Sequence, residues 1–80
     1  MKVGVRVLPR KEVLDSQGRA VAKTLEHHGI TLNSCRVGRF VELEFDTNSM
    51  EEAQKKAKEV AEFVLYNPLV ETYEIEALKE

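Results

Sequence analysis

The strictest constraint on the fold is a period-two alternation of valine with polar or small residues at the start of the chain. It runs through Lys2-Val3-Gly4-Val5-Arg6-Val7. Successive side chains of a β-strand point to opposite faces, so this spacing places the three valines on one face. Pro9 cannot donate to a sheet ladder, and it ends the strand or places it near an edge. The chain is therefore expected to form a sheet with one apolar face that another layer must cover.

Two later segments have helical spacing. Asp15 is a favourable N-cap for the first, and Gly29 stands where a left-handed residue ends a helix. The second begins at the capping box Ser49-Met50-Glu51-Glu52 and ends by about Tyr66, because Pro68 disfavours helix at the preceding residue. Each segment has one face at helical spacing. In the first, this face consists of Ala20, Val21, Thr24, Leu25 and His28; in the second, it is an apolar stripe of Met50, Ala53, Ala57, Val60, Ala61 and Val64.

Three more strands are expected, at residues 34–37, 40–45 and 70–77. The first two flank Gly38-Arg39, and glycine at the first loop position favours a type II′ hairpin turn. Alternation assigns one apolar face to Val41, Leu43 and Phe45 and another to Tyr73, Ile75 and Ala77. The order is β-α-β-β-α-β. Right-handed crossovers then predict an α+β two-layer sandwich, an antiparallel sheet with two helices on one face, as in ferredoxin-like folds.

The small size of the chain favours self-association. Its 80 residues form one domain, residues 1–80, with a thin core. Domains of this size often gain stability from disulfides, metals or oligomers. Cys35 is the only cysteine, and the adjacent His27 and His28 lack the i, i+4 spacing of a helical metal pair. A homo-oligomer is therefore expected.

Composition limits the classes of binding partner and the cellular compartment that we expect. A net charge of −2 with 32% charged residues is typical of an ordinary soluble surface, and no nucleic acid partner is expected. No stretch has the ~18 apolar residues of a membrane span, and no export signal precedes the first strand. Together with the single unpaired cysteine, this indicates a cytoplasmic protein without a membrane partner.

The residues offer little catalytic chemistry. Cys35 could act as a nucleophile, but free cysteine is most often a small buried strand residue. His27 and His28 could supply a base, but a helix C-terminus favours histidine without any reaction. Gly18 opens a helix yet lacks the lysine of a phosphate-binding loop. We therefore predict no catalytic, cofactor-binding or metal-binding residues.

Three motifs, in order and over nearly the whole chain, resemble the PurS family. Residues 13–18 match its valine-leucine-aspartate-proline-glutamine-glycine start of the first helix, with Ser16 in place of proline. Residues 35–43 resemble its valine-arginine-x-glycine-lysine segment and the glutamate-leucine strand that follows, with Arg39 in place of lysine. Residues 65–73 resemble its leucine-x-asparagine-proline motif, which continues with two aliphatic residues, glutamate, one residue and tyrosine.

The resemblance implies a small non-catalytic subunit of phosphoribosylformylglycinamidine (FGAM) synthase, an enzyme of de novo purine biosynthesis. In that family a PurL-type synthetase subunit uses ATP, Mg and formylglycinamide ribonucleotide, and a PurQ-type glutaminase subunit releases ammonia from glutamine. The PurS subunit, a homodimer or dimer of dimers, bridges the two and holds no cofactor. Interface residues suggested by the matched motifs are Asp15, Gln17, Gly18, Arg36, Gly38, Arg39 and Glu42.

One alternative comes from another functional class. An ACT-like regulatory domain that binds small ligands has the same strand and helix order and also dimerises. Such a domain binds an amino acid at its dimer interface, so amino acids would raise its melting temperature. A small acylphosphatase-type enzyme shares the topology as well, but it needs glycines after the first strand, where Pro9-Arg10-Lys11-Glu12 has none.

Overall fold

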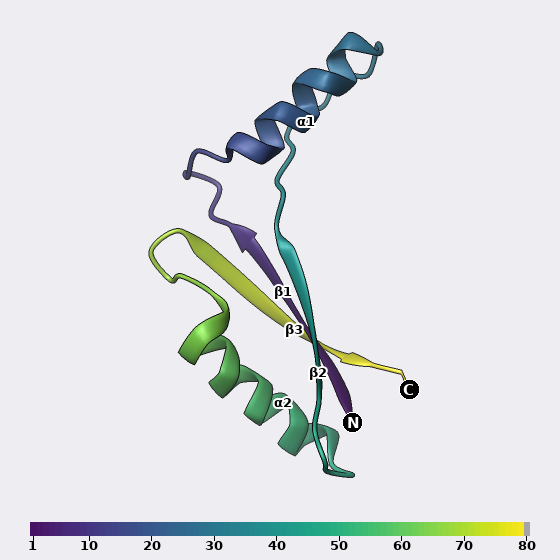
Figure 1. Ribbon diagram of the computed structural model, residues 1–80, viewed down its shortest axis with the longest axis vertical. Coiled ribbons are helices and arrows are strands. Elements are labelled where there is room, and N and C mark those ends of the chain that lie inside the picture. The colour runs from purple at the N-terminus through teal and green to yellow at the C-terminus, as the bar shows by residue number, and fades with distance from the viewer. Residues whose placement is uncertain (80) are drawn as a thin grey trace.

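The computed structural model describes residues 1–79, and Figure 1 shows how their elements are arranged. A sheet forms one layer, and the second helix packs across one of its faces. A short π-helical turn, η1, continues that helix without a break. The described elements are β1 (Lys2–Pro9), α1 (Ser16–His27), β2 (Arg39–Glu44), α2 (Met50–Val60), η1 (Ala61–Leu65) and β3 (Glu71–Leu78).

The sheet is antiparallel, with strand order β2-β1-β3. The central strand is β1, and Val5 faces Val41 on one neighbour and Ile75 on the other. Pro9 is the last residue of β1, so the proline ends the strand as predicted. The predicted antiparallel α+β architecture is confirmed for the sheet and for the helix that covers it.

The core lies between α2 and the valine face of β1. Six residues are fully buried there: Val3, Val5, Val7, Ala53, Ala57 and Ala61. Alanine at the helix positions lets the α2 backbone approach the valines closely, so a single helix covers the valine face of the central strand. The predicted strand faces are confirmed except at one position: Val41, Leu43, Phe45, Tyr73 and Ile75 pack against this core, and Glu42, Glu44 and Glu74 are exposed, but Ala77 near the end of β3 is exposed as well.

The second helix begins and ends close to the predicted residues. Ser49 is its N-cap, and the Ser49 hydroxyl accepts a hydrogen bond of 3.2 Å from the Glu52 amide. Glu52 also pairs with Lys56 at 3.2 Å, one turn later. The helical path ends at Leu65, shortly before Pro68. No helix of residues 1–79 combines the length and the apolar composition needed to cross a membrane.

The predicted hairpin at Gly38-Arg39 is wrong. Residues 34–38 are extended but join no ladder, and β2 pairs with β1 instead. A type II′ turn needs positive φ at its first central residue, and within residues 1–79 only Gly29 has it, at 84°. Gly38 is needed for another reason: a Cβ there would lie 2.0 Å from the Val7 carbonyl oxygen. The chain therefore continues from residue 34 into β2 without a turn.

The first helix does not lie on the sheet, which corrects the prediction of two helices on one face. Figure 1 shows α1 beyond the end of β1, projecting away from the other elements. The radius of gyration is 15.6 Å, whereas a compact domain of this length has about 12 Å. Within residues 1–79, the α1 side chains Val21 and Leu25 therefore do not pack on the sheet.

Candidate subunit interface

Asp15 organises the junction between the loop after β1, the start of α1 and the extended segment before β2. One carboxylate oxygen accepts the Gly18 amide at 2.9 Å, which is the predicted N-cap contact. The other oxygen accepts the Val37 amide at 2.8 Å. The single side chain thus joins segments 22 residues apart, and it supplies the partner that residues 34–38 lack in the sheet.

These contacts also keep Asp15 charged. The Gly18 amide lowers the pKa of the Asp15 carboxyl most, followed by the Val37 amide, and Arg36 contributes more weakly. A carboxylate that accepts backbone amides is stabilised in its ionised form. The junction is therefore built around a fixed negative charge.

Gly18 is required here by close packing. A Cβ at Gly18 would lie 2.2 Å from the Cys35 carbonyl oxygen and 2.6 Å from an Asp15 carboxylate oxygen. The backbone of the extended segment therefore crosses directly over the first turn of α1. Together, Gly18 and Asp15 fix the direction in which α1 leaves the sheet.

Arg39 and Glu71 form a second tie, between β2 and β3. The guanidinium donates to both carboxylate oxygens at 2.7 and 3.0 Å, and it also donates to the Leu65 carbonyl. Glu71 in turn accepts the Asn67 amide at 2.8 Å. Arg39, ahead of Asn67, lowers the pKa of the Glu71 carboxyl, and Glu71 raises the pKa of Arg39. This network fixes the loop between η1 and β3.

The structure brings most of the proposed interface residues together. Asp15, Gln17, Gly38 and Arg39 line one open cleft of about 310 Å³ with Glu71. Gly18 lies buried beneath it, and Arg36 lines a neighbouring cleft that also contains Asp15. Glu42 lies apart, on the outer face of the sheet, 3.6 Å from the Lys2 amine. Whether these residues contact another subunit stays a prediction.

Some residues of this junction were missed from the sequence. Glu71 and Asn67 stand in the matched motif at residues 65–73, but alternation alone gives no sign that Glu71 pairs across the sheet with Arg39. Arg10 was also missed. Its guanidinium donates twice to the Pro68 carbonyl, at 3.0 and 2.9 Å, and so joins the end of β1 to the same loop.

The outer face of the sheet has one aromatic feature. The Phe40 ring lies over Gly4, where a Cβ would come within 2.3 Å of the ring. The Arg6 guanidinium lies 5.8 Å from the ring centroid, and Arg6 also pairs with Glu76 at 2.9 Å. Phe40 remains 50% exposed. A single half-exposed ring among charged side chains is ordinary for a protein surface and marks no site by itself.

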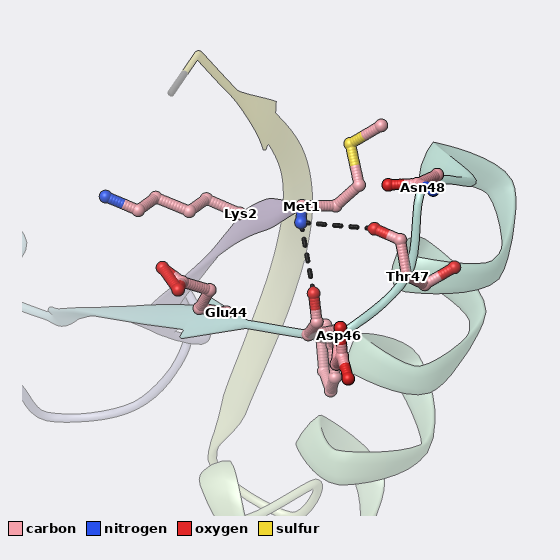
Figure 2. A pocket seen from close by; sticks show the side chains of 7 residues that line it. Met1, Lys2, Glu44, Asp46, Thr47 and Asn48 are labelled. Carbon is pink, nitrogen blue, oxygen red and sulfur yellow. Dashed lines mark hydrogen bonds between the residues drawn. The ribbon is translucent and has the colours of Figure 1, made fainter.

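A further pocket, of about 560 Å³, lies at the opposite end of the molecule and is shown in Figure 2. The Met1 amino group there donates to the carbonyls of Phe45 and Thr47, at 3.0 and 3.4 Å. Glu44, Asp46 and Asn48 complete its wall. These contacts fasten the start of β1 to the turn before α2, which is a structural role.

The candidate nucleophile Cys35 and the candidate bases His27 and His28 lie far apart in the fold. Cys35 is a half-buried free thiol at the junction, and His27 and His28 are exposed at the far end of α1. Within residues 1–79 no group of three histidine, cysteine, aspartate or glutamate side chains is placed to hold a metal ion. The most perturbed titrating group is Tyr73. Burial and its hydrogen bond to Glu62 raise its pKa to about 12, and it packs edge-on against Tyr66.

Comparison with known proteins agrees with this fold. The PurS family model, described as phosphoribosylformylglycinamidine (FGAM) synthase, matches residues 2–79. A curated relative, the phosphoribosylformylglycinamidine synthase subunit PurS of Thermotoga maritima, is 32% identical over 78 residues, which cover 96% of this chain and 95% of the relative.

Solved structures give the same result. Thermus thermophilus PurS superposes with a TM-score of 0.86 at 37% identity, covering 99% of this chain and 94% of that one. A chain in the structure of PurLQS from Thermotoga maritima superposes with a TM-score of 0.86 at 32% identity, covering 96% of this chain and 95% of that one. The likeness thus extends over nearly the full length of each chain.

Proposed function

This chain belongs to the PurS family of phosphoribosylformylglycinamidine synthase subunits, and we propose that it is the non-catalytic bridging subunit of such an enzyme. It links a PurQ-type glutaminase to a PurL-type synthetase, so that ammonia released from glutamine reaches formylglycinamide ribonucleotide. The overall reaction consumes ATP and glutamine in de novo purine biosynthesis.

One observation carries this proposal: the full-length likeness to a chain of the PurLQS structure from Thermotoga maritima. The arrangement of the described residues supports it. Ties such as Asp15–Val37 and Arg39–Glu71 fix surface loops and segments relative to the sheet. Fixed surface loops suit a protein whose work is contact with other subunits.

Self-association is part of the proposal, as a homodimer or dimer of dimers. The helix α1 has twelve residues and stands apart from the sheet, and isolated helices of that length are marginal in water. Its stripe includes Val21, 43% exposed, and Ile30 just beyond the helix is 48% exposed. We propose that a second copy of the chain covers this stripe.

The cofactors and the compartment follow from the same role. ATP, Mg and glutamine belong to the synthetase and glutaminase subunits, and this subunit holds none of them. A purine-biosynthetic complex works where its soluble metabolites are, which places the chain in the cytoplasm. An ACT-like regulatory role is less well supported, because the matching relatives are PurS subunits.

Reconstitution tests the bridging role. Synthetase and glutaminase subunits are assayed for formylglycinamidine ribonucleotide synthesis, with and without this chain, from glutamine and separately from ammonia. Glutamine-driven synthesis is expected to require the chain, whereas ammonia-driven synthesis is not. If both activities are the same with and without it and no complex forms in gel filtration, the bridging role is refuted.

A further inference from the structure

A positively charged cleft lies beside the junction. It has a volume of about 630 Å³ and is formed by the loop after β1, the first turn of α1 and residues 34–36. Four cationic side chains and one carboxylate line it: Arg10, Lys11, Arg19 and Arg36, with Asp15. The whole chain carries a net charge of −2, so this cleft concentrates charge of the opposite sign and focuses an attractive field on anions.

The cations of the cleft are only weakly compensated within residues 1–79: Arg36 is the last of the groups that lower the pKa of Asp15. None of the four forms an ion pair with a carboxylate of residues 1–79. Both oxygens of Asp15 accept backbone amides, from Gly18 and Val37. A single carboxylate cannot offset the charge of four cations, so the cleft keeps a net positive charge.

Two of the arginines are held in place by backbone oxygens. Arg10 donates twice to the Pro68 carbonyl, at 3.0 and 2.9 Å, and Arg36 donates to the Pro9 carbonyl at 3.1 Å. A guanidinium has five donors, so each arginine keeps at least three for a ligand. Fixing two cations in advance reduces the ordering cost of binding an anion.

We propose that this cleft binds a phosphate group, either free or carried as a monoester on a small organic molecule. Arginine matches phosphate geometry through paired hydrogen bonds, and lysine adds a mobile positive charge. The volume lies within the range of small-molecule sites, and Val13 and Leu14 give the cleft an apolar wall for the organic part of an ester. The cleft shares Asp15 and Arg36 with the proposed subunit interface, but phosphate binding by the chain alone and the reconstituted activity are measured separately, and either can fail without the other.

Amide chemical shifts of the intact, ¹⁵N-labelled protein provide the test. Inorganic phosphate, AMP and adenosine are titrated separately at low ionic strength. Phosphate and AMP are expected to shift the Gly18, Arg19 and Arg36 amides saturably, and adenosine is expected to leave them unchanged. Saturation by AMP alone assigns the site to phosphate esters, and saturation by both assigns it to the phosphate group itself.

A charge-matched pair of variants locates the effect. Lys11→Gln with Arg19→Gln removes two exposed cleft cations whose side chains make no hydrogen bond or ion pair within residues 1–79, so folding should be preserved. Lys23→Gln with Lys58→Gln removes two exposed cations elsewhere. The cleft variant is expected to bind AMP or phosphate about tenfold more weakly or worse, and the control variant is expected to bind normally.

Three results would overturn the proposal. The shifts could fail to saturate with either anion, or the control variant could lose as much affinity as the cleft variant. The third result is that neither anion binds, while the cleft variant weakens assembly with the synthetase or glutaminase subunit. That outcome would assign the cleft to an acidic protein surface instead of a phosphate.

Discussion

At the scale of single residues, Asp15 shows how a local signal can have a distant effect. Its capping of α1 follows from its place before Ser16-Gln17-Gly18, because aspartate is a preferred N-cap. The bond from its second oxygen to the Val37 amide has no local signal, since the two residues are far apart in sequence. Sequence reasoning therefore identified the residue but only half of its contacts.

The lowered pKa of Asp15 predicts an acid-sensitive junction. Above the ordinary carboxyl pKa of 3.8, Asp15 is charged in both the folded and the unfolded chain, and its stabilising contribution is complete. As the pH falls through the lower folded-state pKa, folding no longer favours the charged form, and the contribution is lost. Asp15→Asn should therefore be less stable than the wild type at pH 6, and the difference should shrink towards pH 3.

Chemical denaturation at a series of pH values measures this difference. Glu59→Gln, which changes an exposed carboxylate on α2, is the control and should follow the wild-type curve. A constant gap between Asp15→Asn and the wild type from pH 6 to pH 3 would show that the charge of Asp15 does not stabilise the fold.

Gly18→Ala sets helix propensity against packing. Alanine is favoured over glycine inside a helix by about 0.5–1 kcal/mol. The new Cβ, however, would lie 2.2 Å from the Cys35 carbonyl oxygen, which is backbone and cannot rotate away. We expect the clash to dominate and the variant to unfold at a lower denaturant concentration than the wild type.

Gln17→Ala is the matched control, because Gln17 is exposed in the same helical turn. Propensity alone should leave that variant equal to or slightly more stable than the wild type. A stabilised Gly18→Ala would mean that the extended segment does not cross α1 as closely as the structure places it.

At the scale of elements, the boundaries that depend on local chemistry were predictable. Ser49 caps α2, Pro9 ends β1, and alternation assigned the strand faces correctly except at the exposed Ala77. The structure of residues 34–38 was not predictable. A glycine between two strand-like segments gives the same sequence pattern whether it forms a turn or lies close against another strand. The Cβ position of Gly38, against the Val7 carbonyl, distinguishes the two only in three dimensions.

The Arg39–Glu71 pair should contribute more to stability than an ordinary surface pair. Glu71 is only 19% exposed and also accepts the Asn67 amide. Glu71→Ala should therefore cost roughly 1–2 kcal/mol, since that amide loses its partner. Arg39→Lys keeps the charge but loses the two-pronged contact, and it should cost up to about 1 kcal/mol.

Urea unfolding of each variant measures these free energies. Arg6→Lys provides the comparison, because it alters the Arg6–Glu76 pair, in which both side chains are more than 40% exposed. Its effect should be close to zero. If Glu71→Ala is as mild as Arg6→Lys, the network does not fix the loop between η1 and β3.

The exposed stripe of α1 predicts that a single charge can separate the copies of the chain. Val21→Glu places a carboxylate on the stripe, where burial in an interface would leave it unpaired. We expect light scattering after gel filtration to show a loss of oligomer. Lys23→Glu changes the charge more strongly but lies outside the stripe, and it should keep the oligomer. Equal dissociation of both variants would point to net charge instead of the α1 stripe.

At the scale of the whole molecule, the sequence predicted the fold class and the family but not the shape. Two helices of similar amphipathic pattern looked equally suited to cover the sheet. Only α2 does so, with three alanines packed on the valines of β1. Whether a helix packs on its own sheet or on a neighbour is a matter of loop geometry. Here the loop geometry depends on contacts of Asp15 and Gly18. The hydrophobic periodicity of the sequence gives no information about these contacts.

The thin core predicts that folding and association are coupled. Six fully buried side chains, three of them alanines, form the core of the described residues, and α1 adds none of its apolar side chains to it. When a folded chain is stabilised mainly by its partner, mass action makes the melting temperature depend on concentration.

We therefore expect the melting temperature to rise steadily as the chain concentration is raised a hundredfold. Val21→Glu should melt lower and at a temperature that does not change with concentration. A concentration-independent wild-type transition would show that one copy is stable alone, and α1 would then need no second copy to cover it.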